Sequence, residues 1–149
     1  MPVIRLATET DLLAASKIYH RSLSDAKWLS LAARKRISFE CDTDGEEVYV
    51  YVSDSGEIYG FVSIWTASSF VHHLYVDSRF RRSGVGSALL QSLDRWLPRP
   101  WSLKCLKENT AALAFYLTLG WDKTGSGESD DGPYWLLQKK PDEQCGERE

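Results

Sequence analysis

The chain has 149 residues, of which 43% are apolar and 26% charged, and its formal net charge at pH 7 is −3. This composition is typical of one soluble domain with a single core, and it excludes extended disorder. The small negative charge also excludes a general attraction to nucleic acid or to an anionic membrane, so any anionic ligand must be held by a local group of basic residues.

No stretch approaches the ~20 apolar residues of a membrane span, and the N-terminal residues lack the pattern of a secretion signal. We therefore expect a cytoplasmic protein without a membrane partner. The three cysteines, Cys41, Cys105 and Cys145, are far apart and form no CxxC pair, which predicts reduced thiols and no metal. Cys105 lies in an apolar strand pattern, so we place it in the core rather than among the nucleophiles.

The first half of the chain alternates between strand and helix patterns. β-Branched and aromatic residues dominate the strand-like runs, and capping residues precede the first helix-like run. The expected elements are a strand at 3–6, a helix at 12–19, a second helix at 24–39 with imperfect periodicity, and a hairpin of strands at 48–52 and 58–65.

The second half continues with a strand at 70–76, a basic loop containing glycines, and a helix that Pro98 and Pro100 end. The remaining expected elements are a strand at 101–106, a helix capped by Asn109 and ended by Gly120, a turn or mobile loop at 125–132, and a strand at 134–138. We expect residues 1–140 to form one domain and the charged residues 141–149 to form a disordered tail.

The loop between the strand at 70–76 and the following helix predicts an anion site. The first amides of a helix lack partners within the helix and carry the positive end of its dipole. Gly84 and Gly86 remove side chains where phosphate oxygens would approach. Three arginines add positive charge, Arg79, Arg81 and Arg82. Taken alone, the loop could also be a solvated turn in which the glycines only mark the chain reversal.

Two motifs favour the anion site over the solvated turn. The pattern Arg81-x-x-Gly84-x-Gly86, followed by an amphipathic helix, resembles the acetyl-CoA motif of the GNAT (Gcn5-related N-acetyltransferase) superfamily. The later pattern Asn109-x-x-Ala112-x-x-Phe115-Tyr116-x-x-x-Gly120-Trp121 resembles the second signature of that superfamily. Arg81 replaces a glutamine found in many relatives, a variant that leaves the anion chemistry of the loop intact. The expected order of elements also resembles this fold over nearly the whole chain.

The resemblance implies an α/β (α+β) fold with a mixed sheet of about seven strands and about four helices, in which the strands at 70–76 and 101–106 splay apart. It implies an acetyl-CoA-dependent N-acyltransferase that passes an acetyl group to a primary amine by direct attack in a ternary complex. A small molecule is the expected acceptor, and the resemblance favours a homodimer. The open alternatives are a non-catalytic acyl-CoA-binding module and a protein (lysine or N-terminal) acetyltransferase.

The resemblance also implies which residues bind the coenzyme. Backbone groups of the strand before the loop are expected to bind the pantetheine arm and the thioester carbonyl, and loop amides the pyrophosphate. The implied residues are Leu74, Tyr75, Val76, Arg81, Arg82, Ser83, Gly84, Val85, Gly86, Ser87, Asn109 and Tyr116.

Tyr116 matches the tyrosine that in many relatives lies beside the coenzyme sulfur, which implies that it protonates the departing thiolate. The alternative is a core tyrosine that packs under the coenzyme. An imidazole suits removal of the ammonium proton, and His72 and His73 are the candidates. Because successive strand residues point to opposite faces, only one of them can face the cleft unless a bulge intervenes.

His72 aligns with one of two histidines of arylalkylamine N-acetyltransferases, while the other position holds Phe70 here. His73 falls where other relatives carry a glutamate. On a regular strand His72 shares a face with Leu74 and Val76, which favours His72 as the base. Either imidazole could instead be satisfied by a backbone partner.

Three aromatic residues are candidates for the acceptor pocket, because their segments usually flank it in the family: Trp28, Trp65 and Tyr134. They could equally be core residues. Lys104 occupies a position where some protein N-terminal acetyltransferases have a glutamate base. This departure weakens the case for a ribosomal-protein-type substrate.

Overall fold

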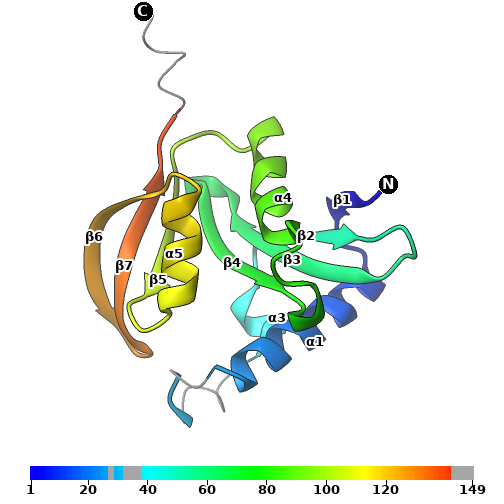
Figure 1. The fold of residues 1–149 in the computed structure, drawn as a ribbon, viewed down its shortest axis with the longest axis horizontal. Coiled ribbons are helices and arrows are strands. Elements are labelled where there is room, and N and C mark those ends of the chain that lie inside the picture. The colour runs from blue at the N-terminus through cyan, green and yellow to red at the C-terminus, as the bar shows by residue number, and fades with distance from the viewer. Residues whose placement is uncertain (27–28, 32–37, 142–149) are drawn as a thin grey trace, which may run out of the picture.

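The computed structural model describes residues 1–26, 29–31 and 38–141, which form a seven-stranded mixed sheet with helices on both faces (Figure 1). The strands are β1 (Val3–Leu6), β2 (Glu47–Val52), β3 (Ile58–Trp65), β4 (Phe70–Val76), β5 (Trp101–Leu106), β6 (Asp122–Ser129) and β7 (Gly132–Lys139). The helices are α1 (Glu9–Ser24), α3 (Phe39–Asp42), α4 (Val85–Ser92) and α5 (Thr110–Thr118), with short 3₁₀ turns at Thr66–Ser68, Ser78–Phe80 and Leu93–Arg95.

The start of α1 confirms the capping residues expected from the sequence. The Asp11 amide donates to Thr8 Oγ1 at 3.2 Å, and the Thr8 amide donates to Asp11 Oδ2 at 3.0 Å. Arg5 of β1 also donates to the same carboxylate at 3.1 Å. This reciprocal cap satisfies two donors that the helix itself leaves unpaired, and the arginine ties the helix start to the sheet edge.

Two apolar clusters lie on opposite faces of the sheet. On β2, Val48, Val50 and Val52 pack under α1 and α3, whereas Tyr49 and Tyr51 pack against the cluster that contains the buried residues of α4 and α5. This is the alternation that a strand covered on both faces requires. The described residues therefore form one sheet between two helical layers.

The strand order is β1-β2-β3-β4-β5-β7-β6, and β4 and β5 are its parallel neighbours. They share only the register pair Phe70↔Ser102, whereas β4 pairs with β3 as far as Val76 and β5 pairs with β7 as far as Leu106. The splayed pair expected from the family resemblance is therefore confirmed. Beyond Phe70, the two strands part and leave a space between them.

Two expectations about local structure are not confirmed. The turn or mobile loop predicted at 125–132 is wrong, because β6 extends to Ser129 and the turn is confined to residues 130–131. The side chains of β6 are small or polar and almost all exposed, so the strand carries no apolar alternation and is held by backbone pairing with β7. Half of the second helix predicted at 24–39 lies outside the described residues, and residues 25–26 and 29–30 of the described half are not helical. Most of the tail also lies outside the described residues.

Within the part of the chain that the structure describes, no helix combines the length and apolar character needed to cross a bilayer. The longest, α1, has 16 residues and carries charged side chains along its length.

The core beneath α1 centres on Phe61, which is fully buried and makes edge contacts with Tyr19 and Phe39. Replacing it by alanine should lower the free energy of unfolding by about 3–5 kcal/mol, because apolar burial is lost and a cavity remains. Leu13→Ala is the control, since that side chain is 66% exposed and its truncation should change stability by less than about 0.5 kcal/mol. Urea unfolding followed by circular dichroism measures both; equal midpoints would contradict the assigned core.

Candidate functional site

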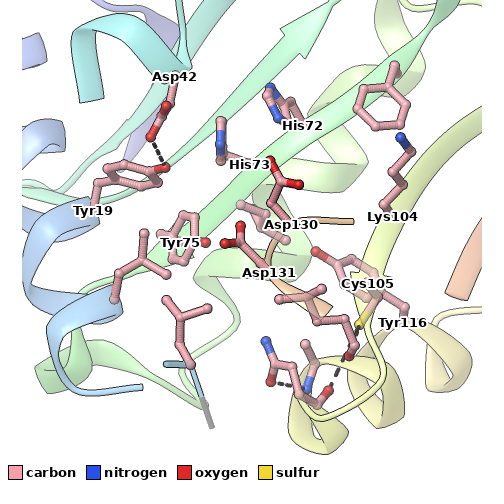
Figure 2. Close-up of a pocket in the computed structure, with 17 residues that line it drawn as sticks. Tyr19, Asp42, His72, His73, Tyr75, Lys104, Cys105, Tyr116, Asp130 and Asp131 are labelled. Carbon is pink, nitrogen blue, oxygen red and sulfur yellow. Dashed lines mark hydrogen bonds between the residues drawn. The ribbon is translucent and has the colours of Figure 1, made fainter. Parts of the chain in front are cut away.

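A cavity of about 480 Å³ opens where β4 and β5 part (Figure 2). Strand β4 forms its floor, α1 and α3 form one wall, and β5, α5 and the β6–β7 turn form the other. The lining residues are Tyr19, Leu23, Leu29, Asp42, Phe70, His72, His73, Leu74, Tyr75, Lys104, Cys105, Leu106, Asn109, Ala112, Tyr116, Asp130 and Asp131. Sequence reasoning named His72, His73, Leu74, Tyr75, Asn109 and Tyr116 among them, and the structure brings these six together.

The start of α4 has the geometry of an anion site. Gly84 precedes the helix with φ +88°, and no side chain caps the first turn. The helical bonding begins when the Ala88 amide donates to Gly84 O at 2.9 Å, so the amides of residues 85–87 have no partner within the helix. Those amides and the helix dipole together favour a negatively charged ligand.

The two glycines of this loop have different reasons to be glycine. A Cβ at Gly84 would meet nothing within 4 Å, so this position is open and its positive φ is what favours glycine. A Cβ at Gly86 would lie 3.2 Å from Phe115 Cζ and 3.6 Å from Val76 Cγ2. The expectation that Gly86 clears space for phosphate is therefore corrected: this glycine allows α4 to approach α5 and the end of β4.

The arginines of the loop also divide. Arg79 donates to Asp77 at 3.0 Å and to Glu57 at 2.5 Å, so its guanidinium is already neutralised by two carboxylates. The sequence-based expectation that Arg79 adds free positive charge is wrong. Arg81 and Arg82 are exposed at the same loop, and they remain the basic side chains available to an anion.

Tyr116 projects from α5 into the cavity (Figure 2) and is 9% exposed. Its ring makes edge contacts with Phe115 and Trp121, at centroid distances of 5.2 and 5.6 Å, which fix its orientation. Burial raises the pKa of Tyr116 above that of a free phenol. The hydroxyl therefore stays protonated at neutral pH and is a proton donor at the cavity wall. Asn109 accepts from the Ala112 amide at 3.3 Å and caps this helix as predicted.

A β-bulge on β4 places both histidines at the cavity. Ser63 of β3 pairs with His73, while Ile64 pairs with Val71, so His72 is the extra residue of the bulge. The argument that His72 shares a regular strand face with Leu74 and Val76 is therefore wrong. The two imidazole centroids lie 3.9 Å apart, and both rings line the cavity (Figure 2).

The two imidazoles share one carboxylate that sequence reasoning missed. Glu46, immediately before β2, accepts a hydrogen bond from His72 Nδ1 through Oε2, and its Oε1 lies 3.7 Å from His73 Nδ1. Ser63 Oγ lies 2.8 Å from His73 Nδ1. Glu46 has no recognisable local signal, because it reaches the histidines only through the pairing of β2, β3 and β4.

The ionisation of this group follows from its contacts. Burial alone would raise the pKa of Glu46, but the hydrogen bond from His72 and the nearby His73 imidazole lower it to about 2. Burial lowers the pKa of His73, with the nearby Glu46 opposing the shift. At neutral pH the cluster therefore contains an ionised Glu46 and a neutral His73.

Of the three aromatic residues proposed for the acceptor pocket, the two that the structure describes, Trp65 and Tyr134, do not line the cavity. Trp65 is 45% exposed and lies over Gly45, where an added Cβ would come within 2.9 Å of the indole ring. Tyr134 packs on β7 with Lys104 Nζ 4.9 Å from its ring centroid. Trp28 lies outside the described residues.

Charged and polar side chains from α1, α3, β5 and the β6–β7 turn line the cavity instead. Tyr19 of α1 donates to Asp42 of α3 at 2.6 Å, and Asp130 and Asp131 reach the cavity from the β6–β7 turn (Figure 2). Lys104 of β5 lies on the wall opposite Tyr19 and Asp42. Three carboxylates and one ammonium give this part of the cavity a negative charge, which suits a cationic ligand.

Cys105 lines the cavity beside Tyr116 but is not an activated thiol. Burial raises the pKa of Cys105 to about 11, so the thiol stays protonated at neutral pH. The prediction that Cys105 is a buried residue is confirmed. Cys41 is exposed, and Cys145 lies outside the described residues.

Comparison with known proteins gives one consistent result. The model of the acetyltransferase (GNAT) family matches residues 11–121. The apo form of YjaB from Escherichia coli matches with a TM-score of 0.80 and 20% identity over 93% of this chain and 97% of that one.

Two further solved structures match with a TM-score of 0.69. The ribosomal-protein-S18-alanine N-acetyltransferase of Escherichia coli is 20% identical over 100% of this chain and 99% of its own. A phosphinothricin acetyltransferase from Sinorhizobium meliloti, solved with AcCoA, is 21% identical over 95% and 89%. At these identities the likeness is one of fold.

Proposed function

The chain belongs to the acetyltransferase (GNAT) family, and on that premise we propose that it transfers an acetyl group from acetyl-CoA to the primary amine of a small molecule. The observation that carries this proposal is a cavity lined by a protonated tyrosine and by two imidazoles that share a buried carboxylate, on a strand that leads to an anion-binding helix start. Acyl transfer to an amine needs a site for the coenzyme, a donor for the thiolate and a base for the ammonium. Each need has a candidate group here.

The coenzyme would lie along the opened edge of β4. Its pyrophosphate suits the free amides of residues 85–87 and the exposed Arg81 and Arg82. The AcCoA bound to the Sinorhizobium meliloti protein of the same fold supports acetyl-CoA as the donor. Leu74 and Tyr75 line the cavity on the way from that loop to the histidines, so the pantetheine arm would follow them toward the reacting atoms.

In the proposed reaction, a base takes one proton from the acceptor ammonium, and the neutral nitrogen then attacks the thioester carbonyl. The carbon–nitrogen bond forms, the carbon–sulfur bond breaks, and Tyr116 donates its phenolic proton to the departing thiolate. The nitrogen loses its second proton as the amide forms, and this proton restores the phenol. Because burial raises its pKa, the phenol is still protonated when the thiolate forms. The imidazoles of β4 are the candidate bases, because they lie in the same cavity.

The charge and volume of the cavity indicate the class of acceptor. The acceptors named for two structural neighbours are phosphinothricin and an alanine of ribosomal protein S18, so fold likeness leaves the choice open. Asp42, Asp130 and Asp131 favour an acceptor that arrives as a cation. A cavity of about 480 Å³ also suits a small amine beside the end of the coenzyme arm.

The pyrophosphate site is tested by Gly84→Glu, which places bulk and negative charge at an open position of the loop. Calorimetry with coenzyme A should then show no measurable binding. Gly56→Glu is a matched control, because Gly56 has φ +89° and equally open surroundings and pays the same backbone strain of about 1 kcal/mol. The site is refuted if Gly84→Glu binds coenzyme A as tightly as Gly56→Glu.

The role of Tyr116 is tested by Tyr116→Phe, which removes only the hydroxyl. We expect kcat to fall roughly 10²-fold with little change in the affinity for acetyl-CoA, because the proton is needed chiefly as the thiolate leaves. Tyr51→Phe is the control, since Tyr51 stacks on Tyr59 outside the cavity and should leave kcat unchanged. Normal turnover by Tyr116→Phe at every pH would make Tyr116 a packing residue.

The acceptor is tested by following free thiol while acetyl-CoA is offered to a panel of amines. Small cationic amines should be acetylated faster than amines that carry a carboxylate, and Asp130→Asn should raise KM for the best amine several-fold, because it removes one favourable charge. Turnover of peptide N-termini or lysines alone would instead support a protein acetyltransferase. Tight binding of acetyl-CoA without turnover of any amine would support a binding module.

A further inference from the structure

Resting on the proposed function, we propose that Glu46 is a positioning residue: it holds the proton of His72 on Nδ1 and so leaves Nε2 as the base that takes the acceptor's proton. This inference assigns the base to one of two adjacent imidazoles. It also gives a role to a side chain that no motif includes.

The tautomer follows from the ionisation of Glu46. Its carboxylate side chain is 5% exposed and ionised at neutral pH, so both oxygens can only accept hydrogen bonds. The hydrogen bond between Glu46 Oε2 and His72 Nδ1 therefore requires the proton to be on Nδ1. In a neutral imidazole the other nitrogen, Nε2, then carries the free lone pair.

The surroundings select His72 over its neighbour. The His72 side chain is 42% exposed and lines the cavity, so Nε2 is the ring nitrogen left to meet a ligand. His73 is 9% exposed, and its Nδ1 is held by Ser63 Oγ at 2.8 Å. The edge of the Tyr19 ring also packs against His73, with 5.1 Å between centroids. His73 is thus a fixed neutral partner rather than the group that exchanges protons.

The backbone delivers Glu46 to this position. The Glu46 amide donates to Thr43 O at 3.0 Å in the turn before β2, and Gly45 in that turn has φ +80°. Trp65 covers the turn, as its close approach to Gly45 shows. The bulge on β4 completes the arrangement, because it brings His72 next to His73 instead of turning it to the opposite face.

The same three side chains are also the kind that bind a transition metal, and their ligand atoms lie within 4.8 Å of one another. The hydrogen bonds favour a Glu46–His72 dyad, in which the carboxylate holds the imidazole, over a metal site. His72 Nδ1 already donates to the carboxylate, and His73 Nδ1 already has the Ser63 hydroxyl as its partner. A metal bound through the two Nδ1 atoms would have to break both contacts, so zinc binding is an outcome that the experiment must check.

The first measurement is the tautomer itself. Two-bond ¹H–¹⁵N correlation spectra report which ring nitrogen carries the proton, and the chain has only three histidines, so His72→Ala identifies the signal. Wild-type His72 should be the Nδ1–H tautomer when neutral, and Glu46→Leu should convert it to Nε2–H. Glu47→Leu, at the neighbouring exposed position, should leave it unchanged. A neutral wild-type His72 protonated on Nε2 overturns the proposal without any variant of Glu46 or any assay of activity.

The second measurement is kinetic and uses the best amine of the panel. Glu46→Leu should lower kcat roughly 10- to 100-fold, as loss of the carboxylate partner does for metal-bound histidines, with KM for the amine nearly unchanged. Glu46→Gln, which keeps an acceptor for Nδ1–H, should recover part of that loss. Adding Glu46→Leu to His72→Ala should not lower kcat further, because each change already disables the same pair of side chains.

Two outcomes separate this proposal from the proposed function. If the tautomer changes as expected but no amine is acetylated by the wild type, the dyad stands as a structural finding and the proposed function fails. If Glu46→Leu loses the tautomer yet keeps wild-type kcat, the positioning role is overturned. Calorimetry with zinc chloride alone should show no micromolar binding; such binding, lost in Glu46→Leu, would assign the three side chains to a metal and overturn the dyad.

Discussion

Strands β4 and β5 share one register pair and then part, and the rest of the site depends on this separation. Strand β4 remains bonded to β3 along its other edge, so its backbone groups beyond Phe70 face a cavity on one side. Buried amides and carbonyls need partners, which makes an opened strand edge a binding surface for an extended polar molecule. The same separation lets side chains of α1, α5 and the β6–β7 turn meet in one cavity.

The two walls of that cavity hold protons in different ways. On the wall formed by β5 and α5, burial keeps the Tyr116 phenol and the Cys105 thiol protonated, with the pKa of Cys105 at about 11. Across the cavity, the hydrogen bond from His72 keeps Glu46 ionised although its side chain is buried. A protonated phenol and an ionised carboxylate thus coexist at one site, because desolvation dominates at the phenol and hydrogen bonding at the carboxylate.

What the sequence could predict was local. The Gly84 helix start, the Asn109 cap and the Cys105 core position each depend on neighbours within a few residues, and the structure has all three. The failures involve long-range pairing. The bulge at His72 exists because β3 and β4 pair out of step, and Glu46 reaches His73 only across an intervening strand. Trp65 has an aromatic side chain suited to a pocket, but its ring packs on the turn at Gly45 instead.

The two outer edges of the sheet bear on how copies of this chain meet. Strand β1 is four residues long, and β6, at the other end of the strand order, has eight residues whose exposed side chains are small or charged. Short strands and charged residues are the features by which sheets resist adding a strand from another molecule. Lateral joining of sheets is therefore disfavoured at both ends. A dimer of the kind that the family resemblance implies would have to form through helices or loops.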